Sequence, residues 1–308
     1  MEKKYIYYHV GPDREGQRLD NALMALHRNT PKNKIYQLIR KGWVRVNLKK
    51  SSQDYRLVDG DEIRYPEWIS DSESRVIEIV KQPNLLENRI IHEDDDMICV
   101  NKPAGLACQK GTNTYVSVID ILKQTYPQIS WHLVHRLDKN SSGLLIVAKS
   151  VKAASWYAKV FKDNKAQKTY WALVDGKWEI NEWFKVDKPI LKKQRFAYSE
   201  VSIAGKEALS FFRRKQIVNF FSLMEVRIKT GRTHQIRVHS SYMGFPLSGD
   251  KKYRSTTSEK HYLLHAAYLS IPLMGKGKYI NFYAPLDEMV RKRLLKMGFV
   301  KKNLSNEE

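Results

Sequence analysis

Residues 133–148 read Leu-Val-His-Arg-Leu-Asp-Lys-Asn-Ser-Ser-Gly-Leu-Leu-Ile-Val-Ala, so a polar segment stands between two apolar runs. Short apolar runs bounded by turn residues predict buried strands. A charged side chain held between buried strands needs a partner of opposite charge. Arg136 is the nearest candidate partner for Asp138 along the chain. Spacing alone favours a structural Asp138, a turn residue that accepts hydrogen bonds from backbone N–H groups.

Composition indicates the kind of partner. The 308-residue chain carries 54 Lys and Arg against 33 Asp and Glu, a formal net charge of +21. Such an excess favours a polyanion, either a nucleic acid or an acidic membrane surface. No apolar run is long enough to span a membrane, and the N-terminal segment lacks the apolar core of a signal peptide. We therefore expect a cytoplasmic protein that binds nucleic acid and no membrane.

Residues 18–66 predict a small domain, after a lead-in at residues 1–17. Apolar residues at helical spacing predict two helices, one from Arg18 to about Leu26 and one that begins near Pro31 and ends at Gly42. Two short strands follow. The second helix is basic and almost without acids, which favours contact with phosphates over an ordinary solvated face.

Residues 67–86 lack clear periodicity and predict a linker, and residues 87–308 a second domain. Its first expected element is a hairpin around Asp94, Asp95 and Asp96. Three acids on a hairpin turn are more often solvated than bound to metal, so no metal site is expected. Cys99 and Cys108 are too few for a disulfide framework or a cysteine zinc site, and we interpret both as packing residues.

Several segments resemble the RluA-type pseudouridine synthases, over residues 18 to about 290. H-R-L-D-K-N-S-S-G at 135–143 resembles one signature of the family, and G-R-T-H-Q-I-R-V-H at 231–239 resembles another. N-K-P-A-G at 101–105, K-T-Y-W-A-L-V at 168–174 and G-F-P-L-S-G-D at 244–250 continue the match. The resemblance implies an α+β fold, in which a small αα-β module precedes a catalytic domain with a mixed or antiparallel sheet.

The resemblance also assigns roles to individual residues. It implies that Asp138 is the catalytic nucleophile and that Arg237 pairs with it. Tyr170 is implied to lie against the target base, and Lys102 to support the catalytic pocket. The target uridine must leave its stack to react, and Arg136 is expected to fill the vacated space because a planar guanidinium stacks on bases.

The N-terminal segments Q-R-L-D-N-A-L-M-A-L and K-N-K-I-Y-Q-L-I-R-K-G-W-V-R-V-N resemble the S4 RNA-binding domain. With this module, the chain is most similar to the RluC and RluD kinds within the family, and the second segment favours RluC. The implied partner is 23S ribosomal RNA or a large-subunit precursor. The residues implied to contact RNA are Lys32, Lys34, Tyr36, Arg40 and Lys41.

The chemistry needs no added reagent. The sequence lacks a Walker loop, a dinucleotide fingerprint and a redox cysteine pair, and isomerising uridine to its C-glycoside requires neither energy nor a redox change. We therefore expect no cofactor, and a monomeric enzyme. A carboxylate paired with a cation stays ionised at neutral pH, which suits a nucleophile.

Two alternatives remain open. A non-catalytic RNA-binding or ribosome-assembly protein would suit the basic charge equally well, although it has no use for a buried ionised Asp138. A nuclease using Asp138 as base would ordinarily cluster carboxylates around a metal ion, and only Asp94, Asp95 and Asp96 could serve.

Overall fold

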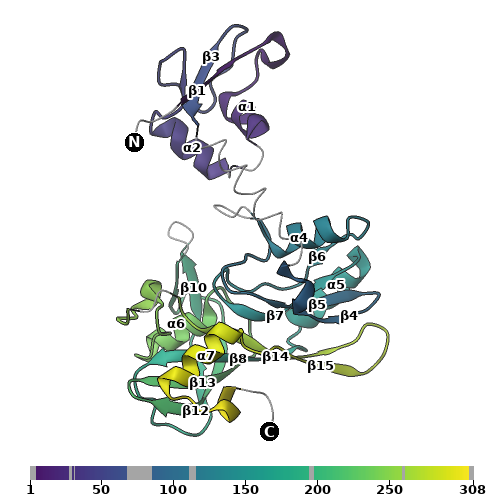
Figure 1. Cartoon of the computed structure of the whole chain (residues 1–308), viewed down its shortest axis with the longest axis vertical. Coiled ribbons are helices and arrows are strands. Elements are labelled where there is room, and N and C mark those ends of the chain that lie inside the picture. The colour runs from purple at the N-terminus through teal and green to yellow at the C-terminus, as the bar shows by residue number, and fades with distance from the viewer. Residues whose placement is uncertain are drawn as a thin grey trace. The chain divides into compact units, whose positions relative to one another are not determined.

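The computed structural model describes residues 5–27, 30, 32–67, 85–110, 116–193, 198–258 and 261–304. The chain divides into two compact units (Figure 1). Unit 1 comprises Met1–Asn84 and Gln109–Ile121, and unit 2 comprises Leu85–Cys108 and Leu122–Glu308. Of the predicted linker at 67–86, residues 68–84 lie outside the described residues.

Unit 1 packs two helices against a small antiparallel sheet. The helices are α1 (Leu19–Leu26) and α2 (Lys32–Arg40), close to their predicted ranges. The sheet has the strand order β1-β3-β2, with β1 at Tyr5–His9, β3 at Glu62–Pro66 and β2 at Arg45–Val46. Both helices and β3 bury apolar side chains in one core, among them Leu23, Leu38 and Ile63.

The lead-in predicted for residues 1–17 is wrong where the structure describes it. Tyr5–His9 form β1, which pairs with the whole of β3. The strand alternates: Ile6 and Tyr8 pack against the core, and Val10 continues the same face into it. This period of two is the signal for a half-buried strand. A short edge strand that is rich in tyrosine shows this alternation of apolar and polar residues only weakly.

Unit 2 is built on a ten-stranded mixed sheet in the order β4-β5-β7-β14-β8-β13-β12-β9, with β15 paired to β14 and β6 to β7. Only β7 and β14 pair in parallel among the strands described. The α+β class and the mixed sheet are confirmed. The strands are β4 (Ile90–Glu93), β5 (Met97–Lys102), β6 (His132–Leu133), β7 (Ser142–Ala148), β8 (Gln167–Asp175), β9 (Phe184–Asp187), β12 (Leu209–Val218), β13 (Phe221–Ile228), β14 (Leu264–Pro272) and β15 (Tyr279–Tyr283).

The remaining described elements lie outside this sheet. The hairpin β10 (Ile190–Lys193) and β11 (Tyr198–Val201) stands apart from it. Helix α6 (Gln235–Tyr242) contributes Val238 to a core shared with that hairpin. Helix α5 (Val151–Lys162) begins after Ser150, whose Oγ accepts from the Ala153 N–H at 3.1 Å. Helices α4 (Val118–Thr125) and α7 (Glu288–Met297) complete the described set, with short turns η1 (Pro12–Arg14), η3 (Glu87–Arg89), η5 (Lys251–Tyr253) and η6 (Lys301–Leu304).

The sheet presents two distinct faces at β8, because neighbouring strand residues point to opposite sides. Trp171 lies on the side covered by α7, where it shares a core with Leu294 and Phe299 (Figure 1). Tyr170 therefore lies on the other side. None of the described helices is long and apolar enough to cross a bilayer.

Candidate active site

Asp138 lies in the connection between β6 and β7, as the two apolar runs predict. His135 anchors the start of this connection. Its Nε2 accepts a hydrogen bond from the Ile146 N–H at 2.9 Å, and its ring stacks on Phe161 of α5 with centroids 4.2 Å apart. Burial, and then the charge of Lys168, lower the pKa of His135 to about 3. The imidazole is therefore a neutral packing group of this loop.

Gly143 fixes the point where the loop enters the sheet. It has a φ of +105°, and a Cβ there would lie 2.3 Å from the carbonyl oxygen of Ala266. Ala266 of β14 pairs with Gly143 on one side and with Tyr170 of β8 on the other. The glycine of the signature thus lets the loop pass beside the strand that carries the predicted aromatic residue.

Lys102 holds the same loop from β5. Its side chain is fully buried, and Nζ donates to the carbonyls of Pro103 (3.0 Å), Leu106 (2.7 Å) and Lys139 (3.2 Å). Burial lowers the pKa of Lys102 to about 8, against the opposing charges of Cys108 and Asp138. Because Lys139 follows Asp138, Lys102 ties the N-K-P-A-G turn to the backbone beside that carboxylate. It donates to carbonyls, not to a carboxylate as in a structural salt bridge.

Arg237 meets Asp138 as the resemblance implies. Arg237 Nη1 donates to Asp138 Oδ2 at 3.0 Å, across 99 positions of sequence. The other edge of the guanidinium donates to Asp250, from Nε to Oδ2 at 2.6 Å and from Nη2 to Oδ1 at 2.9 Å. Asp250 is 2% exposed, whereas 23% of the Asp138 side chain remains exposed. One arginine thus joins a buried carboxylate to an accessible one.

Two tyrosines enclose this arginine. The guanidinium carbon lies 4.8 Å from the ring centroid of Tyr253 and 4.6 Å from that of Tyr262. Burial opposes the charged form, but the hydrogen-bonded Asp250, with smaller contributions from Tyr262 and Asp138, raises the pKa of Arg237 above its usual value. The guanidinium therefore carries a permanent, oriented positive charge toward Asp138.

Tyr170 is 9% exposed on its strand. Burial, and then the nearby charge of Asp138, raise the pKa of Tyr170 above its usual range. The phenol therefore stays protonated at neutral pH. It lies near the carboxylate and can offer both an aromatic ring and an O–H group to a substrate in that space.

His234 also lies beside the carboxylate. It has a left-handed backbone conformation (φ 57°) at the N-cap position immediately before α6. Its Nδ1 lies 2.7 Å from the Tyr253 hydroxyl, and its Nε2 lies 3.8 Å from Asp138 Oδ2. Burial lowers the pKa of His234, so its ring is neutral at pH 7.

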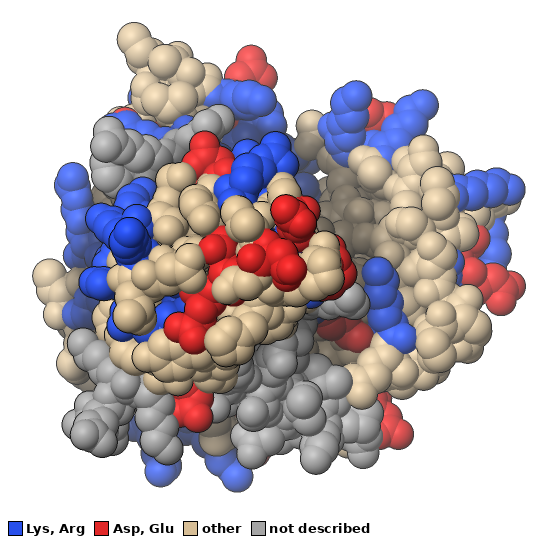
Figure 2. All heavy atoms as spheres, turned by 90° about the horizontal axis from the view of Figure 1, so that it is seen from above, with Lys and Arg blue, Asp and Glu red and all other residues tan. Residues whose placement is uncertain are grey.

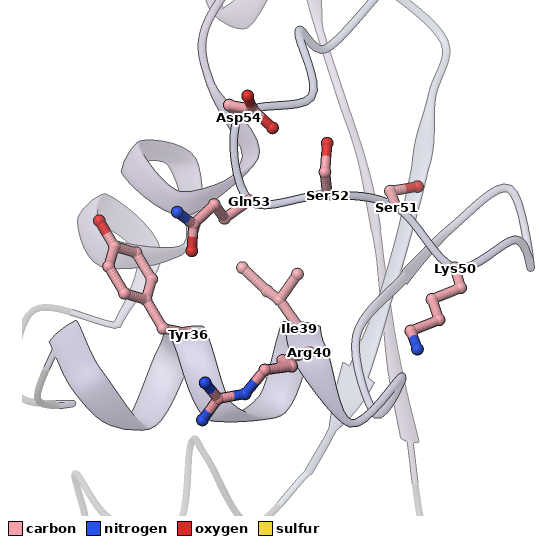
Figure 3. A pocket seen from close by; sticks show the side chains of 8 residues that line it. All are labelled: Tyr36, Ile39, Arg40, Lys50, Ser51, Ser52, Gln53 and Asp54. Atoms are coloured by element: carbon pink, nitrogen blue, oxygen red, sulfur yellow. The ribbon is translucent and has the colours of Figure 1, made fainter.

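Arg136 is exposed. No hydrogen bond or ion pair joins it to any residue in the described part of the chain. The five residues implied to contact RNA lie elsewhere, on α2 of unit 1 and immediately after it. There Tyr36 donates to Asp20 at 3.1 Å, and Lys32 Nζ lies 5.3 Å from the Tyr36 ring centroid. Tyr36 and Arg40 line a pocket opposite the segment Lys50–Asp54 (Figure 3).

Sequence reasoning missed four residues of this site: Asp250, Tyr253, Tyr262 and His234. Asp250 ends the G-F-P-L-S-G-D segment and His234 lies inside the second signature, so the matched segments contained both. Nothing in the spacing indicated that Asp250 would bind Arg237. Tyr253 and Tyr262 lie outside the matched segments, and isolated tyrosines carry no signal of that kind.

Comparisons with known proteins identify the family of this chain. Residues 96–242 match the family model for RNA pseudouridylate synthase. The chain is 34% identical to ribosomal large subunit pseudouridine synthase C of Vibrio cholerae, over 94% of this chain and 95% of the relative. It is 36% identical to the protein of the same name from Buchnera aphidicola, over 80% and 79% of the two chains.

The fold has a matching solved structure. Human RNA pseudouridylate synthase domain containing 4 superposes with a TM-score of 0.60 and 22% identity, over 71% of this chain and 96% of that one. The identity over nearly the whole length of the Vibrio cholerae relative establishes the family. This chain belongs to the RNA pseudouridylate synthases, enzymes that isomerise uridine to pseudouridine in RNA.

Proposed function

We propose that this protein converts specific uridines of large-subunit ribosomal RNA, or of its precursor, to pseudouridine. It would act as a monomer in the cytoplasm without a cofactor. The curated relatives carry the name of a large-subunit synthase. The net charge of +21 suits a polyanionic substrate. Figure 2 shows Lys and Arg side chains in several separate groups, with a group of acidic side chains near the centre of the view.

We propose Asp138 as the group that begins the reaction. The carrying observation is the 3.0 Å bond from Arg237 Nη1 to Asp138 Oδ2, at a carboxylate still 23% exposed. Asp138 Oδ1 has no hydrogen-bond partner among the described residues, so it is available to a substrate. The charged arginine pairs with this accessible carboxylate and holds it in one orientation.

The reaction balances without other reagents. The N1–C1′ bond breaks, the free uracil turns, and C5 joins C1′. C5 then loses its proton while N1 gains one. Asp138 would start this sequence by attack on the sugar or the base, or by removing the proton at C2′. Tyr170 would lie against the base, and Arg136, exposed beside Leu137, would stack in the space that the uridine leaves.

We further propose that unit 1 holds the RNA through α2, as an S4-like domain. Lys32, Arg40 and Lys41 are exposed there. Lys34 and Tyr36 lie on the same helix, and Tyr36 faces the pocket of Figure 3. Cations and an aromatic ring on one helix suit phosphate contact and base stacking.

The test is Asp138→Asn, which preserves the shape of the side chain and removes its charge. We expect the variant to bind large-subunit ribosomal RNA within about twofold of the wild type and to release no tritium from RNA labelled at C5 of uridine. Asp94→Asn, at the hairpin turn between β4 and β5, is the control and should keep its activity. Pseudouridine formation by Asp138→Asn would contradict the role proposed for Asp138.

A further inference from the structure

A second hollow lies on the α7 side of the large sheet. It is lined by three successive cations of one strand, Arg213, Arg214 and Lys215, together with Asn181, Glu225 and Asn303. Successive residues of a regular strand point to opposite faces, so three in a row would not ordinarily line one hollow. The strand is irregular here: Arg214 pairs with Met224 and Gln216 with Leu223, which leaves Lys215 as an extra residue. Such a bulge redirects side chains, and bulges are common beside functional sites.

Arg213 and Arg214 each have N–H donors that bind no other group among the described residues. Arg213 uses Nη2 to bind Glu225 Oε2 at 2.6 Å, and Arg214 uses Nη1 to bind the carbonyls of Trp178 and Glu179, both at 3.0 Å. Within the described residues, Nε and Nη1 of Arg213 and Nε and Nη2 of Arg214 have no partner. On Arg214, the free Nε and Nη2 share one edge of the guanidinium, and such an adjacent N–H pair matches two oxygens of a phosphate, while Arg213 adds single donors beside it.

The local charge is positive even with the acids counted. Glu225 accepts from Arg213 and also from Arg227, at 3.0 Å, so two arginines neutralise it. The Glu179 carboxylate lies 3.9 Å from Arg214 Nη1 but is 77% exposed. An anion that enters the hollow therefore meets an excess of cations.

An aromatic ring holds the cations in place. The guanidinium carbons of Arg213 and Arg227 lie 4.8 Å and 4.4 Å from the ring centroid of Trp183. Cation–π contact with this ring restricts the two side chains. Donors that are already fixed lose less entropy when they bind a ligand.

We propose that this hollow binds a backbone phosphate of the RNA substrate, away from the target uridine. Trp171, Glu225 and Arg213 are in register across β8, β13 and β12, so they share the face opposite Tyr170. The RNA would therefore extend beyond the catalytic side and wrap the sheet. The proposal rests on the proposed function for the identity of the RNA.

The test is the double variant Arg213→Gln with Arg214→Gln, compared with Lys276→Gln with Lys278→Gln. The second pair removes the same charge from exposed positions of the β14–β15 connection. Binding to large-subunit ribosomal RNA transcribed in vitro is measured at several salt concentrations. We expect roughly tenfold weaker binding at 0.1 M salt and a salt slope reduced by about one for the pocket pair only.

A second variant separates charge from folding. Asn181→Asp adds a negative charge at the rim and removes no contact among the described residues, and it should weaken RNA binding with an unchanged unfolding midpoint. Equal affinity and slope for the pocket pair and the control pair, or an unaffected Asn181→Asp, would overturn the proposal. Weakened binding by a protein that makes no pseudouridine in this RNA would leave the phosphate site standing and reject the proposed function.

Discussion

Asp250 shows how much a single side chain outside the reaction can decide. It accepts hydrogen bonds from Nε and Nη2 of Arg237 and leaves the remaining nitrogen, Nη1, directed at Asp138. If only one of the two carboxylates were present, the buried guanidinium of Arg237 would turn toward that one. The distance between Arg237 and Asp138 therefore depends on a residue that the substrate does not reach.

Asp250→Asn should lower kcat tenfold or more and change the KM for RNA by less than about twofold. The loss of a buried charge partner should also cost about 3 kcal/mol of folding stability. The control is Asp287→Asn, whose carboxylate pairs with Arg89 at 2.9 Å and is 38% exposed. It should leave kcat unchanged. An Asp250→Asn enzyme with normal kcat would show that Arg237 needs no second carboxylate for its position.

At the scale of elements, the site depends on three neighbouring strands, β7, β14 and β8. Gly143, Ala266 and Tyr170 are in register across them, and Asp138 precedes β7 by a few residues. The only parallel pairing among the described strands lies here. The backbone of Ala266 lies closer to Gly143 than a side chain at that position would permit. The geometry of the site therefore requires glycine there.

Gly143→Ala tests this condition against Gly105→Ala. Both glycines have positive φ, +105° and +88°, so both alanine variants carry the backbone strain of about 1–2 kcal/mol. Only at Gly143 does the new Cβ meet backbone, at 2.3 Å, whereas Gly105 has open space. Denaturant unfolding should show about 1–2 kcal/mol lost for Gly105→Ala and more than about 4 kcal/mol, or no folded protein, for Gly143→Ala. Similar losses at both positions would mean that β7 and β14 can separate.

Helices and strands could be predicted from the sequence where their apolar residues recur at a regular local spacing. The two helices of unit 1 and the β4–β5 hairpin agree with the prediction because apolar spacing and turn residues indicate the same elements. β1 was missed because its partner β3 lies more than fifty residues away.

The residues of the site likewise divide into those that the sequence indicated and those that it did not. The resemblance of two signatures indicated Asp138 and Arg237, and the structure brings them together. The enclosure of Arg237 by Asp250, Tyr253 and Tyr262 depends on the tertiary path of residues 244–262 and has no period or motif of its own. Short-range sequence patterns do not encode contacts of that kind.

For the molecule as a whole, histidines whose pKa is lowered in the folded chain make stability depend on pH. Burial lowers the pKa of His265 and His234 to about 4, and burial with the charge of Lys168 lowers that of His135 to about 3. The geometry explains the neutral forms. His135 Nε2 accepts from the Ile146 N–H, and His265 Nε2 donates to the Ala284 carbonyl while Nδ1 faces the Ser142 hydroxyl.

The sign follows from proton binding. Near pH 5 the unfolded chain, with ordinary histidine pKa values near 6.5, holds these protons and the folded chain does not, so protons favour unfolding. Stability should therefore be intact above pH 6.5 and fall as the pH drops toward 4, by about 3–4 kcal/mol per pH unit near pH 5 from these groups. His265→Gln keeps a neutral donor and acceptor but cannot take up a proton. Its denaturant unfolding curves between pH 6.5 and 4.5 should show a slope smaller by about 1.4 kcal/mol per pH unit, whereas a slope equal to that of the wild type would mean that His265 is already charged in the folded protein.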